Sequence, residues 1–397
     1  MPLGLYISVP FCRTKCSYCN FASDVFSKAV FGKYVDRVCS DIANAYRIAE
    51  EMRGELDGVV DTIYLGGGTP SVLDPAELQR IFAAARNRFE VQADAEITVE
   101  CAPGTLTPAV IDSLVSSGVN RVSLGLQSFV DKEASAVGRL HTRETALADI
   151  AKLRAAGISN INLDLIAGLP HQTMESWRYS LEEVIATGVP HVSVYMLDVD
   201  EDSRLGRELI AGGTKYHAHF VPDEDLTADL YGVACERLHA AGIEQYEISN
   251  FADTGRESRH NLKYWTRQPY LGFGVDAHSM LRSLDPDAEA VRFSAPDSLE
   301  DFTAGKPGPR TVITSRAALE ECFFLGLRLN AGVNLEPLRA QFGTTVVSQF
   351  SPTLLDLASL ELIDWSGDNI RLTARGRLLS NDVFERFLQE QETPQPS

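Results

Sequence analysis

Three cysteines near the beginning of the chain have the type and spacing of metal ligands. Cys12, Cys16 and Cys19 form the pattern C-x3-C-x2-C, and cysteine thiolates are the usual ligands of iron–sulfur clusters. Three thiolates can bind three irons of a [4Fe–4S] cube and leave the fourth iron open, as in a reactive rather than a structural centre. A zinc site would need further ligand pairs, and the remaining cysteines occur singly, at Cys39, Cys101, Cys235 and Cys322. The pattern therefore predicts an open [4Fe–4S] cluster.

A glycine-rich segment, Gly66-Gly67-Gly68-Thr69-Pro70, follows the second predicted strand. Glycine lets the backbone approach a ligand closely and present its N–H groups. A tight turn between a strand and a helix is an alternative explanation of the same residues. Because the segment comes one strand after the cysteine loop, we expect it to belong to the same site.

Two carboxylates lie in the predicted strands that follow. Glu100 ends the third strand, where it can pair with an ammonium group, and Asp164 lies in the otherwise apolar fifth strand. A buried charge without a partner is costly, so Asp164 needs one. The alternatives are a solvated loop acid for Glu100 and a structural salt bridge for Asp164.

The first two thirds of the chain alternate predicted strands and helices, which indicates parallel βα units. The predicted strands are Leu5–Val9, Thr62–Leu65, Glu96–Glu100, Arg121–Gly125, Asn160–Ile166 and His191–Leu197. The predicted helices are Tyr34–Met52, Pro75–Arg88, Pro108–Ser117, Arg143–Ala156 and Met174–Thr187. These repeats are too few for a closed eight-stranded barrel. We therefore expect an α/β fold with an incomplete barrel, whose functional groups gather at the carboxyl ends of the strands.

Composition limits the kinds of partner. The chain has 397 residues, 44% of them hydrophobic, and a formal net charge of −19. This charge argues against nucleic-acid and anionic-membrane partners. Neither a signal peptide nor an apolar run of about eighteen residues is found, so no transmembrane segment is expected. A cytoplasmic location suits free thiols, and transient contact with a membrane-bound partner stays open.

The cysteine spacing, with Tyr18 just before the third cysteine, resembles the signature of the radical S-adenosylmethionine (SAM) superfamily. The resemblance implies a partial (β/α)6 barrel, in which the open iron binds SAM and one electron cleaves SAM to a 5′-deoxyadenosyl radical. In that family, the glycine-rich segment holds the amino group of SAM. Arg139 would pair with the SAM carboxylate, and Asp164 would bind the ribose hydroxyl groups. Ala102 departs from the family pattern, which has asparagine there. The positions that match SAM contacts are Tyr6, Gly66, Gly67, Gly68, Thr69, Glu100, Gln127, Arg139 and Asp164.

The segments YISVPFC, YLGGGTPS, LGLQSF and NLDLIAGLP resemble the HemN-like group. That group comprises oxygen-independent coproporphyrinogen III oxidases and HemW-type heme chaperones. The oxidases continue the third cysteine with Gly-Cys and have an N-terminal extension, whereas Asn20-Phe21 follows Cys19 here, as in the HemW type. The resemblance thus implies a chaperone that binds a cluster, SAM and heme and passes heme to an acceptor protein.

Two enzymatic alternatives remain. One is the oxidative decarboxylation of coproporphyrinogen III to protoporphyrinogen IX, which the Asn20-Phe21 pair opposes. The other is a radical SAM reaction on a different tetrapyrrole. The set of positions that match SAM contacts favours some retained radical chemistry, and no catalytic residue is assigned.

Residues Arg259–Trp265 match the HNxxYW motif of HemW proteins, which implies that His260 binds heme. A neutral imidazole can ligate heme iron, and aromatic rings can stack on the macrocycle. Alternatively, the loop packs Tyr264 and Trp265 onto the barrel and leaves His260 as a hydrogen-bonding residue.

Three further histidines are weaker candidates. His278 is a second candidate heme ligand, although Asp276 stands in its loop where the family usually has glycine. His217 and His219 are interpreted as structural or surface residues.

We expect four segments along the chain. Residues 1–283 form the barrel with the heme-motif extension, and residues 284–314, rich in Pro, Asp and Gly, form an extended, mobile connection. Residues 315–389 show helices, a hairpin near Gly367 and a last helix over Ala374–Gln389, which indicates a winged-helix-like α+β domain. The resemblance implies that this domain covers the barrel mouth, and residues 390–397 are predicted to be a disordered tail.

Overall fold

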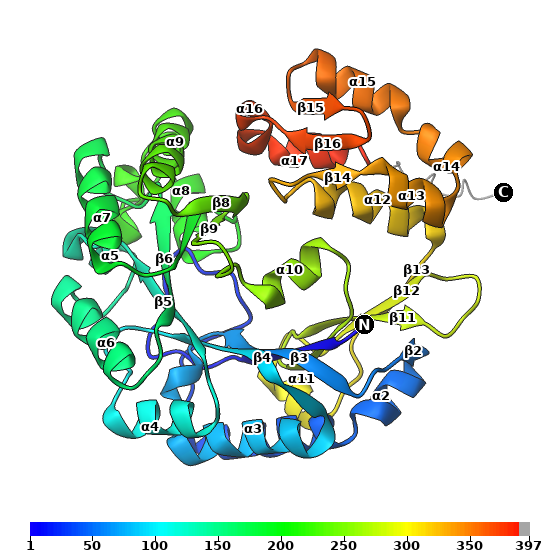
Figure 1. Cartoon of the computed structure of the whole chain (residues 1–397). Coiled ribbons are helices and arrows are strands. Elements are labelled where there is room, and N and C mark those ends of the chain that lie inside the picture. Colours follow the sequence, from blue (N-terminus) through cyan, green and yellow to red (C-terminus); the bar gives the residue numbers. More distant parts are fainter. Residues whose placement is uncertain (389–397) are drawn as a thin grey trace.

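The structure is a computed structural model that describes residues 1–388 (Figure 1). The predicted tail over residues 390–397 therefore lies outside the described residues. Within residues 1–388, no helix has both the length and the apolar character needed to cross a membrane.

Six parallel strands form the centre of the large sheet: β1 (Leu3–Val9), β3 (Val59–Gly67), β4 (Glu90–Cys101), β5 (Arg121–Gln127), β6 (Asn160–Ala167) and β7 (His191–Met196). They pair in this order, each with the next. The sheet stays open, because its outermost strands, β13 and β8, do not pair with each other. The predicted α/β partial barrel is thus confirmed.

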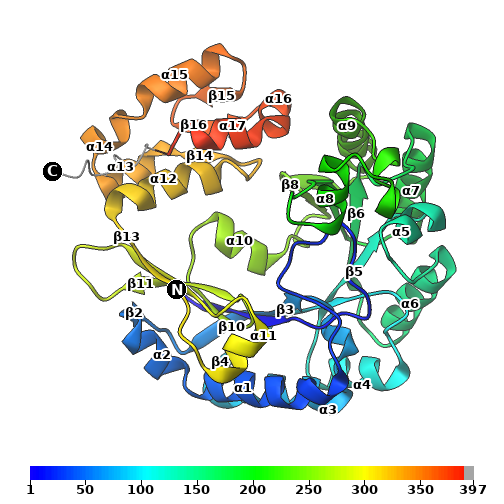
Figure 2. The ribbon, with the colours of Figure 1, turned by 180° about the vertical axis from the view of Figure 1, so that it is seen from behind.

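Helices cover the outer face of this curved sheet (Figures 1 and 2). They begin where the sequence supplies capping groups: Asp74 and Glu77 form a capping box at α3, and Thr107 and Thr142 cap α4 and α6. The helices after the barrel strands are α1 (Phe31–Ala43), α2 (Ala45–Glu51), α3 (Pro75–Arg88), α4 (Pro108–Ser116), α5 (Asp131–Ala136), α6 (Arg143–Ala155), α7 (Met174–Thr187), α8 (Arg204–Ile210) and α9 (Glu224–Ala240).

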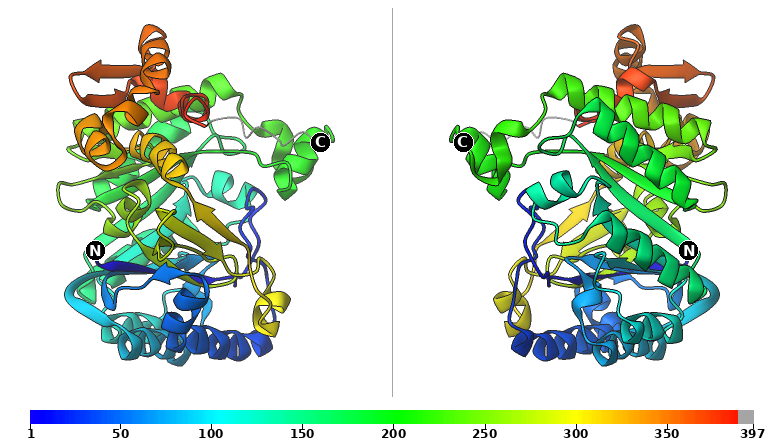
Figure 3. Two further views of the ribbon diagram at one scale, coloured as in Figure 1. Left: turned by 90° about the vertical axis from the view of Figure 1, so that its right-hand side faces the viewer. Right: turned by 90° about the vertical axis from the view of Figure 1, so that its left-hand side faces the viewer.

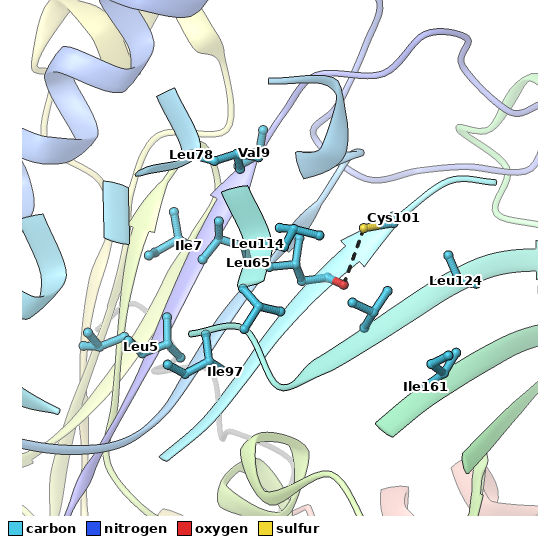
Figure 4. Close-up of a cluster of buried hydrophobic side chains, with 14 of the residues drawn as sticks. Leu5, Ile7, Val9, Leu65, Leu78, Ile97, Cys101, Leu114, Leu124 and Ile161 are labelled. Carbon is cyan, nitrogen blue, oxygen red and sulfur yellow. Dashed lines mark hydrogen bonds between the residues drawn. The ribbon is translucent and has the colours of Figure 1, made fainter. Parts of the chain in front are cut away.

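The two faces of the barrel strands differ in polarity. Apolar residues such as Ile7, Leu65 and Leu124 alternate along the strands, and they lie in one buried cluster with the helix residues Leu78 and Leu114 (Figure 4). Side chains alternate between the two faces of a strand. The intervening residues, which include Tyr64, Glu100 and Asp164, therefore give the barrel a polar interior.

Residues 284–314 are not the extended, mobile connection that their composition predicts. They contain β12 (Ala290–Ser294), α11 (Leu299–Ala304) and β13 (Arg310–Ile313), and β12 pairs with β11 (His278–Ser283). With β10 (Tyr270–Gly274), which pairs with β1, they extend the large sheet. Val291 is fully buried in this extension. The prediction was wrong because pairing with β11 and burial outweigh the local turn-forming composition.

On the other side of the barrel, β8 (Glu244–Glu247) and β9 (Asn250–Ala252) form a hairpin, and β9 pairs with β7. The short helix α10 (Arg259–Trp265) follows and contains the predicted heme motif. The 3-10 helix η3 (Lys215–Phe220) follows α8. At the opposite end of the sheet, the short strand β2 (Gly54–Glu55) pairs with β11.

A smaller α+β domain follows, with its own apolar core around the packed rings of Phe323, Phe350 and Phe387. The predicted hairpin is confirmed as β15 (Ile363–Ser366) and β16 (Asn369–Leu372). The predicted last helix is instead two short helices that meet at Leu379, α16 (Ala374–Leu378) and α17 (Ser380–Glu385). The other elements are α12 (Ser315–Gly326), β14 (Val333–Asn334), α13 (Leu335–Phe342), α14 (Thr344–Ser348) and α15 (Ser351–Ser359).

Glu321 of α12 joins this domain to the barrel. Its carboxylate lies 2.8 Å from Arg267 Nε, just after α10, and 2.9 Å from Arg292 Nη1 on β12. The Glu321 side chain is only 6% exposed. It is thus a nearly buried carboxylate between two guanidinium groups.

Replacement of Glu321 by Ala should lower the free energy of unfolding by about 3 kcal/mol, because it leaves a largely buried guanidinium unpaired. Urea denaturation would measure the change. Asp356→Ala is the control, since Asp356 pairs with Arg386 at the surface and should contribute less than about 1 kcal/mol. Equal effects of the two substitutions would contradict a special role for Glu321.

Candidate functional site

A cavity of about 410 Å³ opens at the carboxyl ends of the parallel strands. Its walls are the cysteine loop, the glycine-rich segment after β3 and the ends of β4 to β7. Figure 3 shows the cysteine loop, in blue, next to the green segment with α8, and Leu205 N–H of that segment donates to Ser17 O. Of the predicted site residues, the cavity brings together Cys12, Cys16, Cys19, Gly67, Gly68, Thr69, Glu100, Gln127, Arg139 and Asp164.

The cysteine loop is fixed by Phe11, directly after β1. The Phe11 ring is fully buried and stacks on Phe31 at 3.9 Å between centroids. Cys12 N–H donates to Asp24 O at 3.0 Å, which closes the loop. The three cysteines of the loop are free thiols. Burial raises the pKa of Cys12, and Thr69 Oγ1 donates to its sulfur at 3.7 Å.

The glycine-rich segment packs against this loop rather than exposing its donors. A Cβ atom at Gly68 would lie 2.8 Å from the carbonyl oxygens of both Val9 and Phe11. The N–H groups of Gly68 and Thr69 donate to those same oxygens at 2.8 Å. These two N–H groups are therefore already engaged, and the close approach explains the glycine.

Glu100 lies at the cavity wall in an environment with few charges. It accepts hydrogen bonds from Tyr64 Oη at 2.8 Å and from Gly67 N–H at 3.2 Å. Burial raises the pKa of Glu100 to about 7. Gly66 does not line the cavity, but a Cβ there would lie 2.9 Å from the Glu100 carboxyl group. Glycine at position 66 thus leaves room for this carboxyl group.

Asp164 is held by neutral partners. Ser123 Oγ and Asn162 Nδ2 donate to its two oxygens at 3.0 and 2.7 Å, and burial raises the pKa of Asp164. No salt bridge involves Asp164 within residues 1–388. The structural salt bridge considered for this residue is therefore absent from the described part of the chain.

Arg139 is a buried cation of the cavity wall, which Lys15 also lines. Its Nη2 donates to Tyr18 Oη at 3.3 Å, while its buried Nε has no hydrogen-bond partner among the described residues. Gln127, beside it, has a left-handed backbone with φ of 72°, which is strained for a residue with a side chain. An unpaired buried donor is costly, so this wall suits an anionic ligand.

Tyr6 and His260 do not line this cavity. Tyr6 lines a second cavity of about 250 Å³. His260 is only 1% exposed. Its Nδ1 lies 2.9 Å from Thr62 Oγ1 and its Nε2 lies 2.8 Å from Tyr264 Oη. Burial lowers the pKa of His260 to about 3, so the ring is neutral. In this structure, His260 is therefore a hydrogen-bonding residue, which was the alternative to a heme ligand.

Sequence reasoning missed part of the cavity wall. Tyr195 and Met196 at the end of β7 line it, as do Asp200 and Asn20, whose side chains hydrogen-bond at 2.8 Å. The signal that could have found Tyr195 is its position at the end of a predicted parallel strand. Nothing in the sequence indicates that Asn20 and Asp200 meet.

The raised pKa of Glu100 predicts pH-dependent binding of a ligand with an ammonium group, such as SAM. Below pH 7 the carboxyl group is largely neutral, and above it the carboxylate attracts the ammonium group. The affinity for SAM should therefore rise between pH 6 and pH 8, by at most about tenfold per pH unit. Calorimetric titration would measure it, and Glu100→Gln should abolish the dependence. A wild-type affinity that is equal at both pH values would refute the assignment.

Comparisons with known proteins agree with this architecture. Residues 6–184 match the family described as Radical SAM superfamily, and residues 313–379 match the HemN C-terminal domain. Among solved structures, coproporphyrinogen III oxidase (HemN) from Escherichia coli superposes with a TM-score of 0.81 at 25% sequence identity. The match covers 97% of this chain and 90% of that chain.

Full-length relatives are similar in sequence as well. A Bacillus subtilis protein named Heme chaperone HemW is 33% identical over 97% of this chain and 99% of its own length. The Lactococcus lactis protein of the same name is 32% identical over 98% and 97%. The chain therefore belongs to the radical SAM superfamily and, within its HemN-like group, to the family of the HemW proteins.

Proposed function

We propose that the chain is a heme chaperone, which binds heme and a SAM-ligated [4Fe–4S] cluster and transfers heme to an acceptor protein. The observation that carries the proposal is similarity over nearly the whole length to proteins named Heme chaperone HemW. A cytoplasmic location suits its seven free cysteines. The net charge of −19 argues against a nucleic-acid partner.

The chemistry of the cysteine side chains supports the proposed iron–sulfur cluster. Cys12, Cys16 and Cys19 are free and line one cavity, and thiolates are the ligands that such clusters require. With SAM bound, a cluster of this kind supplies one-electron chemistry. The loop itself is held in place by Phe11 and by the contacts with Gly68 and Thr69.

The polar residues at the strand ends, beside the cysteine loop, have groups that suit SAM. The unpartnered Nε of Arg139 can donate to a carboxylate. With its pKa raised to about 7, the carboxyl group of Glu100 is only partly ionised at pH 7. A nearby ammonium group favours its ionised form. The Asp164 carboxylate can accept hydrogen bonds from hydroxyl groups, and Gln127 completes this wall.

The second candidate function is the oxidation of coproporphyrinogen III, because the fold superposes on that oxidase over 97% of this chain. The residue after Cys19 distinguishes the two candidates. Asn20 donates to Asp200 Oδ2 at 2.8 Å and so joins the cysteine loop to the end of the barrel. The oxidases are expected to have Gly-Cys here, which could not form this bond.

Cys16→Ala should remove the visible absorption of the cluster, together with most of its iron and sulfide, because two thiolates do not hold the cube. The control is Cys235→Ala, which changes a half-buried cysteine distant from the loop in sequence. Iron, sulfide and absorption should be determined after anaerobic reconstitution. A Cys16→Ala protein that keeps the iron and sulfide content of the wild type would refute the cluster site.

The two candidate functions predict different outcomes in one anaerobic reaction. The reconstituted chain is supplied with SAM, a reductant and coproporphyrinogen III, and mass spectrometry follows the loss of carboxyl groups. The formation of 5′-deoxyadenosine shows that the preparation is active. We expect an unchanged porphyrinogen and, in a parallel titration, binding of hemin. Decarboxylated product would overturn the chaperone proposal in favour of the oxidase.

A further inference from the structure

The second cavity, of about 250 Å³, has four tyrosine and phenylalanine side chains in its wall. The rings of Tyr6, Tyr264 and Tyr270 contribute, and so does Phe21, whose side chain is 64% exposed. Tyr264 and Tyr270 meet edge to face, with centroids 4.6 Å apart. Gly67 and Phe21 also line the cluster cavity. A ligand here would therefore lie next to the cysteine loop.

His278 stands at this cavity with a free ring. It is the first residue of β11 and lines the cavity, and its side chain is 67% exposed. Neither ring nitrogen makes a hydrogen bond within the described residues. The carboxylate of Asp276 lies 3.6 Å from His278 Nε2.

The backbone of Asp276, the residue whose carboxylate faces His278, has an unusual conformation. Its backbone is left-handed, with φ of 55°, a conformation that is strained for a residue other than glycine and that often marks functional sites. Metal-binding histidines typically donate one N–H to a carboxylate and ligate through the other nitrogen. The Asp276–His278 pair can form this arrangement if the two groups approach by roughly 0.6–0.9 Å, from 3.6 Å to an ordinary hydrogen-bond distance.

His260 is placed quite differently. Both of its ring nitrogens are engaged, with Thr62 and with Tyr264, and the ring packs on Tyr64 at 5.2 Å between centroids. To reach an iron atom, it would have to break one of these bonds inside the barrel. In its present position, His260 instead holds the hydroxyl group of Tyr264, whose ring lines the cavity.

We propose that His278 is the axial ligand of the heme iron, and that His260 is a positioning residue that orients Tyr264. The inference rests on the proposed heme binding. Aromatic walls suit a flat macrocycle, and a neutral imidazole is a common iron ligand. The cavity is smaller than the pockets of about 300–1,000 Å³ that enclose whole small molecules. It would cover only part of the heme and leave the rest accessible to an acceptor.

The test is a titration of the cluster-loaded chain with hemin, followed by electron paramagnetic resonance and magnetic circular dichroism, with the hemin-free cluster spectrum subtracted. The wild type should show a histidine-ligated heme. His278→Ala should lose this signature and bind hemin at least about tenfold more weakly, and added imidazole should restore the signature. His260→Ala and Tyr264→Phe should keep the signature and weaken binding by less.

Matched variants keep the outcomes separable. His239→Ala changes an exposed histidine that pairs with Glu244 and should behave as wild type. Tyr264→Phe removes only one hydroxyl group, so it remains informative if His260→Ala misfolds. A His278→Ala protein that retains the histidine signature would overturn the inference while leaving heme binding intact. A wild-type chain that binds no hemin would overturn the proposed chaperone function itself.

Discussion

The backbone of Gly68 lies so close to the cysteine loop that no side chain fits between them. Its N–H group and that of Thr69 donate to the carbonyl oxygens of Val9 and Phe11, and a Cβ at Gly68 would lie 2.8 Å from both. Phe11, buried against Phe31, fixes the other side of the loop. Every other feature of the site depends on this contact, because it sets where the three thiols face the ends of the strands.

Burial in the polar interior of the barrel changes the ionisation of the two carboxyl groups there. Glu100 and Asp164 are surrounded by hydrogen-bond donors without charge, and burial raises the pKa of each. The buried Nε of Arg139, in contrast, is a hydrogen-bond donor without an acceptor among the described residues. A ligand that carries both an ammonium group and a carboxylate would satisfy these groups together. The polar groups of the cavity are thus complementary to a zwitterion.

The two cavities share Gly67 and Phe21, so the cysteine loop and the glycine-rich segment each contribute to the walls of both. Phe21 belongs to the loop that carries the cysteines. Under the proposed function, heme in the second cavity would lie beside the loop that carries the cysteines.

The sequence alone determined the features that depend on local pattern. The C-x3-C-x2-C spacing, the glycines and the alternation of strands and helices predicted a partial barrel whose site residues gather at one edge, and most of those residues do. It could not place Tyr6 and His260, because the wall that a side chain faces depends on strand register and on α10, which packs from far along the chain. It also misjudged residues 284–314, since β12 exists only through pairing with β11. Only the tertiary structure decided that His260 is enclosed by hydrogen bonds while His278 is open, because burial is a property of the packed fold.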